Sequence, residues 1–331
     1  MPALFASAPG ADSVAALDCG TNSTRLLVAG PDGEVLEREM RITRLGEGVD
    51  ATRRLSEEAV ARTVGVLAEY RRLMDAHGVS RARLVATSAV RDADNAEAFL
   101  SAAAEATGVV PEVLSGLEEG RLSFAGAVAG LPTAAGSGPV LVVDIGGGST
   151  ELAAGVPGAP LDQVAAISVD VGCVRVSERF LRHDPPRADE LARARAFVDE
   201  ALARAKEALP ALEPGGTLVG LAGTVSTLAS LAQGLERYER DRIHHFELSR
   251  REVARWLAVL AADDHAGRLA RPGMVRGRED VIVGGVLVLD AVMEDFDRNR
   301  CLVSEDDILD GIVAGLRAGG ATAESGRGHL A

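Results

Sequence analysis

The chain has 331 residues, of which 47% are hydrophobic and 3% aromatic, a composition typical of a globular protein long enough for two well-buried domains. Its formal net charge of −14 argues against general affinity for nucleic acid or anionic membranes, although a local basic channel stays possible. The three cysteines lack metal-ligand spacing and the N-terminus lacks a secretory signal pattern, so we expect a reduced, cytoplasmic protein.

The first lobe begins with a glycine loop between two apolar runs. These runs predict strands near Val14–Cys19 and Thr24–Ala29, followed by a third strand near 34–42. Glycine lets main-chain N–H groups approach an anion, and a flanking carboxylate can hold a divalent cation against that anion. The loop is therefore a candidate phosphate and metal site, with an ordinary glycine-rich hairpin as the alternative. Its candidate ligands are Asp18, Asn22, Ser23 and Thr24.

A helix from Ser56 to about Gly78 precedes a strand near Arg83–Ala89. The segment TSAVRDADN, residues 87–95, then opens a single helix that reaches about Gly108. Thr87, Ser88 and Arg91 at this helix start can donate hydrogen bonds to phosphate oxygens. The alternative is simple capping by Asp92 with an exposed Arg91.

The next helix, about 117–129, carries adjacent glutamates in its first turn. Ser115 and Glu118 form a capping box, so Glu118 has a structural role. Glu119 has no such partner and is a candidate to orient and deprotonate water. A favourable interaction of Glu119 with the helix dipole is the alternative.

The segment 131–139 is rich in small residues and proline, and we place the lobe boundary there. Directly after it, VLVVDIGGGSTELAAG repeats the first glycine loop, with strands near 140–144, 150–156 and 162–171. The two copies match at Asp18/Asp144, Gly20/Gly146, Ser23/Ser149 and Thr24/Thr150. An internal repeat at this separation indicates two related lobes, and two facing phosphate loops predict a cleft between them. The second copy adds the candidates Asp144, Gly146, Gly147, Gly148, Ser149 and Glu151.

A short helix to Arg182 and a long one over 187–209 lead to a strand at Thr217–Leu221. The glycine loop that follows runs directly into a helix and is a third candidate phosphate site, with Gly223 and Thr224 as ligands. Nearer the C-terminus, His244 and His245 lack a third metal ligand. The arginines at 268, 271, 276 and 278 either are solvated or receive a polyanion.

The last predicted elements are a helix over 280–293, a strand over 301–303 and a helix over 306–317. The longest apolar run, Val281–Leu289, is too short to span a bilayer. The motifs GxxxxGK[ST], GxSxG, HExxH and GxGxxG are absent, which argues against P-loop NTPases, serine hydrolases of that type, zinc peptidases and dinucleotide-binding proteins.

The three glycine loops resemble the two phosphate loops and the adenosine loop of the actin/hexokinase/Hsp70 superfamily. The ordered motifs TSAVRDADN, SGLEEGRLSFAGA, VVDIGGGSTEL and GLAGTVSTL resemble, more narrowly, the exopolyphosphatase/guanosine pentaphosphate phosphohydrolase (Ppx/GppA) family, over about 14–317. This resemblance implies an α/β protein with two duplicated ribonuclease H-like (actin-like ATPase) lobes. Each lobe would be a mixed β-sheet flanked by helices, with an interlobe cleft.

The same resemblance implies hydrolysis of the terminal phosphoanhydride of inorganic polyphosphate, with Mg²⁺ or Mn²⁺. It makes Glu119 the general base and Asp144 and Glu151 the metal-site acids, to which we add Asp18 as an expected third ligand. By the resemblance, the residues that hold phosphate oxygens are Asn22, Ser23, Arg91, Gly146, Gly147 and Ser149. From the glycine loops we add Thr24, Gly148, Gly223 and Thr224 as expected phosphate ligands. Long family members carry further C-terminal helical domains, so we expect polyphosphate of short to moderate length as the substrate here. Family members are commonly dimers, and we expect a homodimer.

Three alternative functions stay open. Guanosine pentaphosphate (pppGpp) is the second candidate substrate. A kinase-like enzyme would transfer phosphate from ATP to a small acceptor, and a non-catalytic sensor would bind polyphosphate or nucleotide without hydrolysing it. We expect an N-terminal lobe over 1–134 joined by a C-terminal helix at about 304–318, a C-terminal lobe over 135–303, and a disordered tail over 319–331.

Overall fold

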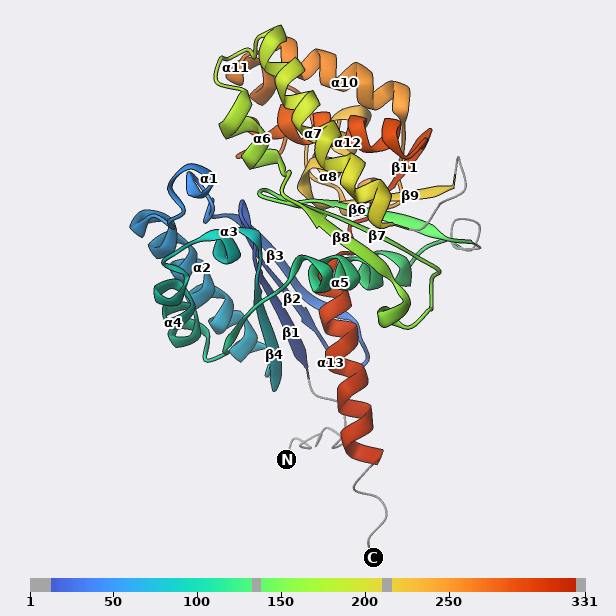
Figure 1. The fold of residues 1–331 in the computed structure, drawn as a ribbon. Coiled ribbons are helices and arrows are strands. Elements are labelled where there is room, and N and C mark those ends of the chain that lie inside the picture. Colours follow the sequence, from blue (N-terminus) through green and yellow to red (C-terminus); the bar gives the residue numbers. More distant parts are fainter. Residues whose placement is uncertain (1–12, 133–137, 210–215, 326–331) are drawn as a thin grey trace, which may run out of the picture.

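The computed structural model describes residues 13–132, 138–209 and 216–325. Within them the chain forms two separate mixed β-sheets, each covered by helices on its outer face (Figure 1). Two further helices, α5 (Gly116–Ala129) and α13 (Ile308–Ser325), pack against each other between the sheets. The predicted fold class is therefore confirmed.

The first sheet has the strand order β3-β2-β1-β4-β5. Strand β1 pairs antiparallel with β2 and parallel with β4, so the N-terminal strand lies at the centre. Helices α2 and α4 cover the outer face and bury an apolar cluster that includes Leu67 and Phe99. The elements of this half are β1 (Val14–Cys19), β2 (Ser23–Ala29), β3 (Val35–Ile42), α1 (Val49–Thr52), α2 (Glu57–Ala76), β4 (Arg81–Ala86), α3 (Ser88–Asp92), α4 (Ala96–Thr107) and β5 (Pro111–Val113).

The second sheet has the order β10-β11-β9-β6-β7-β8 and repeats this plan. Strand β6 pairs antiparallel with β7 and parallel with β9, as β1 does with β2 and β4. The largest apolar cluster lies between this sheet and its outer helices. The elements are β6 (Val140–Ile145), β7 (Thr150–Gly155), a 3₁₀ turn (Leu161–Gln163), β8 (Ala165–Val169), α6 (Cys173–Phe180), α7 (Ala188–Ala208), β9 (Thr217–Leu221), α8 (Ala222–Gln233), α9 (Arg240–Ile243), β10 (Glu247–Ser249), α10 (Arg250–Ala262), α11 (His265–Leu269), α12 (Ile282–Asp295) and β11 (Arg300–Val303).

Helices α5 and α13 approach very closely because each has a glycine at the contact. A Cβ atom on Gly126 would lie 1.8 Å from the carbonyl oxygen of Asp307, and one on Gly311 would lie 2.2 Å from that of Leu122. Helix α13 packs on the first sheet, whereas Phe124 of α5 belongs to the core of the second. Helix α5 thus joins the sheet that follows it in the chain, so the boundary drawn at 131–139 does not coincide with the packing.

The predicted elements differ from the observed ones at a few places. The single helix expected after residue 87 is two helices, α3 and α4, because the backbone turns extended at Ala93. Short elements such as β5, α9, β10 and α11 were not expected, since runs of three to five residues carry little periodicity. The last helix extends to Ser325, so 319–325 are helical rather than a disordered tail, and 326–331 lie outside the described residues.

Ion pairs hold the two halves together beside the cleft. The buried Arg175 of α6 contacts Asp50 of α1 and Asp92 of α3, at 2.6 Å in both cases. Arg44, after β3, contacts Asp280, before α12, at 2.7 Å. Several charged contacts therefore cross between the two sheets.

Candidate active site

The loops that follow β1 and β6 face one another across a pocket between the two sheets. The predicted residues Asp18 and Asp144 both line it, as does Glu119 from the first turn of α5. The other predicted residues that line the pocket are Asn22, Ser23, Gly146, Gly147, Ser149 and Gly223. Loops from separate parts of the sequence thus converge as the internal repeat predicts.

The two repeated hairpins have the same backbone but different charges. In the first hairpin Asp18 lies opposite Arg25 on β2, and in the second Asp144 lies opposite Glu151 on β7. Asp18 therefore has a cation as its cross-strand neighbour, whereas Asp144 has a second carboxylate. This difference makes the pocket electrostatically asymmetric.

Arg25 neutralises the first hairpin. Its Nη2 and Nε atoms donate to Oδ2 of Asp18 at 2.7 and 3.0 Å, and its Nη1 atom contacts Asp307. Burial raises the pKa of Asp18, and the guanidinium of Arg25 opposes that rise. The second oxygen of Asp18, Oδ1, is buried without a hydrogen-bond donor, so one ligand atom of this carboxylate stays available.

The two carboxyl groups of the second hairpin, Asp144 and Glu151, are both buried. Asp144 accepts a hydrogen bond from Ser123 and Glu151 accepts one from Ser168, both at 2.7 Å. Burial raises the pKa of Asp144 to about 6. Burial, together with the neighbouring Asp144, raises the pKa of Glu151 to about 7. Both shifts show that the site stabilises negative charge poorly without an added cation.

Glu119 lies against these two carboxylates with little solvent contact. Glu119 is 9% exposed, and the Nη1 atom of Arg91 lies 3.4 Å from Oε2 of Glu119. Burial raises the pKa of Glu119 well above the usual range, with the charge of Glu151 as the second cause. A cation beside Asp144 and Glu151 would relieve this crowding and leave the Glu119 carboxylate ionised, able to accept a proton from a water in the pocket.

Several hydrogen-bond donors around the pocket have no protein acceptor. Within the described part of the chain, the main-chain N–H groups of Thr21, Asn22 and Gly147 donate to no backbone or side-chain oxygen. The side-chain Nδ2 of Asn22 and the hydroxyl of Ser88 are also buried without partners. Converging unpaired donors of this kind favour an anion as ligand.

Arginine reaches the pocket at the third glycine loop. A Cβ atom on Gly223 would lie 1.7 Å from Cζ of Arg278, so the guanidinium packs where only glycine leaves room. Arg278 is 8% exposed and lines the pocket. Of the arginine cluster in the sequence, this residue faces the site, whereas Arg268 and Arg271 pair with Asp184 and Asp263.

Several predicted ligands lie away from the pocket wall. The hydroxyl of Thr24 bonds to that of Thr43 at 2.8 Å, and Thr224 packs close to Gly285. Gly148 lines a small neighbouring pocket with Asp92 and Arg175. Among the described residues, one group of three side chains has metal-ligand atoms that all lie within 4.8 Å of one another, namely His265, Glu279 and Asp280. This group contains none of the predicted metal ligands Asp18, Asp144 and Glu151.

Sequence reasoning missed Arg25 and Asp307 as site residues, and the structure brings both to the pocket or its wall, together with the predicted Ser88. The available signal for Arg25 was its place in the repeat, because it aligns with Glu151, seven residues after the aspartate in both copies. Asp307 is distant in sequence and gave no signal.

None of the helices in the described residues combines the length and apolar composition that a bilayer crossing requires.

Two repeated mixed sheets, with a phosphate-type pocket between their equivalent hairpins, define an actin-like ATPase fold. The Ppx/GppA phosphatase family model matches residues 28–317, and the chain belongs to this family. The resemblance drawn from the sequence is therefore confirmed.

Three relatives illustrate the match. Exopolyphosphatase 2 of Mycobacterium tuberculosis is 42% identical over 319 residues, which cover 92% of this chain and 98% of that protein. A crystal structure of an exopolyphosphatase-like protein has a TM-score of 0.86 and 37% identity, over 92% of this chain and 99% of that one. A guanosine-5'-triphosphate,3'-diphosphate pyrophosphatase of Vibrio vulnificus is 34% identical over 90% of this chain and 58% of its own length.

Proposed function

We propose that the protein is an exopolyphosphatase, which hydrolyses the terminal phosphoanhydride bond of inorganic polyphosphate and releases orthophosphate. The observation that carries this proposal is the meeting of unpaired N–H donors with three crowded carboxylates, Glu119, Asp144 and Glu151. The donors suit a terminal phosphate, and the carboxylates suit a cation and a general base. The name of the Mycobacterium tuberculosis relative supports the same substrate.

In this mechanism the main-chain groups of Asn22 and Gly147 hold the terminal phosphate, with Arg278 nearby. Glu119 accepts the proton of the attacking water from its place on the pocket wall, and a cation beside Asp144 and Glu151 would lower its raised pKa so that the carboxylate is ionised to do so. Arg91 keeps that carboxylate oriented from 3.4 Å. Phosphoryl transfer depends mainly on positioning and charge stabilisation, which these groups provide.

A divalent metal fits the second hairpin. Asp144 and Glu151 offer carboxylate oxygens, which are the ligands that hard divalent cations prefer. Their pKa values are raised, and an added cation would lower them again. Asp18 contributes its unpaired Oδ1, although Arg25 competes for that carboxylate. We therefore place Mg²⁺ or Mn²⁺ at Asp144 and Glu151, with Asp18 as the weaker ligand. When bound, the metal would neutralise charge that develops on the phosphate oxygens.

Hydrolysis of pppGpp is the second candidate function, and a neighbouring cavity favours it. This cavity of about 450 Å³ shares Arg25, Gly223 and Arg278 with the phosphate pocket. Its wall includes the exposed apolar side chains of Met40 and Tyr238, which suit a nucleoside better than a polyphosphate chain.

The test compares phosphate release from tripolyphosphate, long polyphosphate and pppGpp, each with magnesium. We expect Glu119→Gln to lower kcat by about 10²- to 10⁴-fold, the usual contribution of a general base. Glu118→Gln is the matched control, since Glu118 caps the same helix and faces away. Unchanged release in Glu119→Gln would reject the proposed base. Binding without release in the wild type would indicate a sensor, and ATP consumption that requires an acceptor would indicate a kinase.

Two further expectations belong to this proposal. The three cysteines are buried free thiols, which fits action in the reducing cytoplasm. The homodimer expected from the family resemblance stays a prediction, and light scattering on the purified chain measures it directly.

A further inference from the structure

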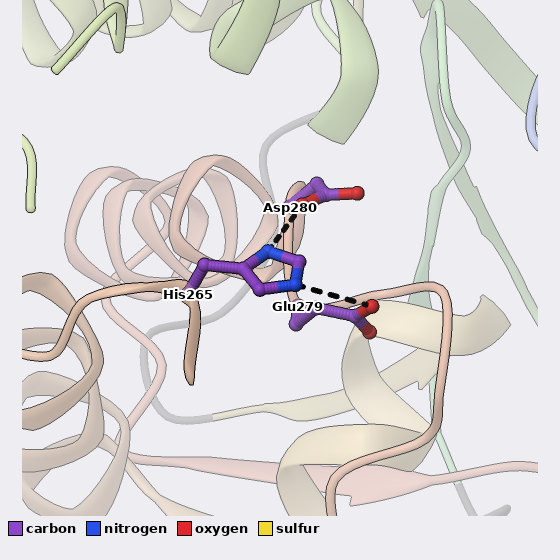
Figure 2. Close-up of side chains that lie close together, drawn as sticks. All are labelled: His265, Glu279 and Asp280. Atoms are coloured by element: carbon purple, nitrogen blue, oxygen red, sulfur yellow. Dashed lines mark hydrogen bonds and ion pairs between the residues drawn. The ribbon is translucent and has the colours of Figure 1, made fainter. Parts of the chain in front are cut away.

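A second group of metal-ligand side chains lies outside the catalytic pocket. His265 begins α11, while Glu279 and Asp280 lie in the turn before α12. One ligand atom from each residue can be chosen so that all three lie within 4.8 Å of one another. Figure 2 shows the imidazole ring of His265 between the two carboxylates, with one ring nitrogen directed to each.

The two ring nitrogens of His265 have different partners. Nδ1 lies 2.8 Å from Oδ1 of Asp280, a normal hydrogen-bond distance, so an ionised Asp280 accepts the Nδ1–H proton. Nε2 lies 4.0 Å from Oε1 of Glu279, which is too long for a hydrogen bond. In the neutral ring this arrangement leaves the lone pair of Nε2 free to bind a ligand.

Glu279 is a buried carboxylate with one oxygen unused. Its side chain is 10% exposed, and its Oε2 accepts a hydrogen bond from the N–H group of Gly277 at 2.6 Å. Among the described residues no hydrogen-bond donor reaches Oε1, the oxygen directed at His265. This oxygen keeps contact with solvent, so a cation can reach it and pair with it.

The backbone around this group is held by a buried arginine. Arg268 of α11 is 5% exposed, and its Nε donates to the carbonyl of Glu279 at 2.8 Å. Its Nη2 donates to Oδ1 of Asp184 at 2.6 Å, and the other oxygen of Asp184 accepts the main-chain N–H of His265 at 2.7 Å. The backbone at His265 and the backbone at Glu279 are thereby fixed to the same Arg268–Asp184 pair.

We propose that His265 Nε2 and Glu279 Oε1 bind a divalent transition-metal ion such as Zn²⁺, with Asp280 orienting the imidazole ring. Metal-binding histidines usually donate their other N–H to a carboxylate, as His265 does to Asp280. Zinc bonds to nitrogen and oxygen are about 2.1 Å long, so a tetrahedral ion holds two ligands about 3.4 Å apart. A small closure of the 4.0 Å gap achieves this geometry.

The site is separate from the catalytic metal site in place and in chemistry. None of its three residues lines the phosphate pocket. Its imidazole ligand favours zinc, nickel or cobalt over magnesium, whereas the catalytic carboxylates favour magnesium. Asp280 also contacts Arg44 of the other half at 2.7 Å, so an ion here would stiffen a contact between the halves.

The opposing interpretation is an imidazolium ion that bridges two carboxylates without any metal. Zinc binding to the full chain, measured by isothermal titration calorimetry with magnesium in excess to fill the catalytic site, distinguishes the two. The thiols compete little for zinc, because Cys19, Cys173 and Cys301 are each at most 1% exposed. We expect one zinc ion per chain.

Three variants locate the ion. His265→Asn keeps a donor near Nδ1 for Asp280 but removes Nε2, so we expect at least tenfold weaker zinc binding. We expect a comparable loss in Glu279→Gln and a 10- to 100-fold loss in Asp280→Asn. His183→Asn is the matched control, because His183 also pairs with one carboxylate, Glu190, at 2.8 Å. Absence of stoichiometric zinc binding, or equal binding by wild type and His265→Asn, overturns the proposal.

Discussion

Glu151→Gln provides a quantitative test of the crowded carboxylates. Glu151 is 2% exposed, and burial and Asp144 raise its pKa from 4.5 to about 7. The folded protein therefore binds more protons at this residue than the unfolded chain does, between about pH 4.5 and pH 7. The glutamate then costs no stability well below pH 4.5, and its cost grows as the pH rises to 7. Glutamine removes the charge but still accepts the hydrogen bond from Ser168.

The size of the effect follows from that pKa. Each pKa unit corresponds to about 1.4 kcal/mol, so the linkage relation gives a stabilisation by Glu151→Gln of about 3 kcal/mol at pH 8. The same relation gives about 1 kcal/mol at pH 5 and close to zero at pH 3.5. Magnesium should reduce the gain at pH 8, since the wild type would then have a cation beside this carboxylate.

Urea unfolding at three pH values in the presence of a chelator measures these differences. Glu118→Gln is the control, because Glu118 is exposed and glutamine preserves the capping box. It should change the free energy of unfolding by less than about 0.5 kcal/mol at each pH. A gain in Glu151→Gln that is the same at pH 5 and pH 8 would falsify the electrostatic explanation.

Three further substitutions test other parts of the site. Arg25→Met should lower the free energy of unfolding by about 3 kcal/mol, because it leaves two buried carboxylates without their cation; urea unfolding measures this, and a loss below about 1 kcal/mol would contradict it. Gly223→Ala should displace the guanidinium of Arg278 and raise KM about 10- to 100-fold, the equivalent of a lost charged hydrogen bond, whereas an unchanged KM would show that Arg278 does not bind substrate. Gly65→Ala, at an exposed position inside α2 with open space around it, should stabilise the protein by about 0.5–1 kcal/mol and leave activity unchanged.

The sequence predicted the repeated hairpins well because their signals are local. An apolar strand, an aspartate, glycines and a second strand determine the turn, and β1, β6 and β9 lie within one residue of the predicted ranges. The capping box at Ser115 was also predicted, since it depends on residues only three positions apart.

Contacts between distant segments could not be predicted in this way. Arg25 reaches Asp307, and Arg278 reaches Gly223, through tertiary packing that no spacing rule encodes. The position of α5 also depends on tertiary packing. Its sequence precedes the boundary, yet Phe124 packs in the core of the second sheet, because α13 occupies the corresponding face of the first.

The charge difference between the two hairpins explains how a duplicated fold can have a single catalytic centre. Equivalent positions on β2 and β7 carry Arg25 and Glu151, so the first aspartate is neutralised within the protein while the second is not. The uncompensated hairpin is the one beside Glu119, where burial and Glu151 already raise the pKa of the proposed base. A cation that binds Asp144 and Glu151 would lower that pKa and ready Glu119 to take a proton. Exchange of the two charges, in Arg25→Glu combined with Glu151→Arg, should therefore abolish activity even if both hairpins fold, and circular dichroism with a phosphate-release assay distinguishes these outcomes.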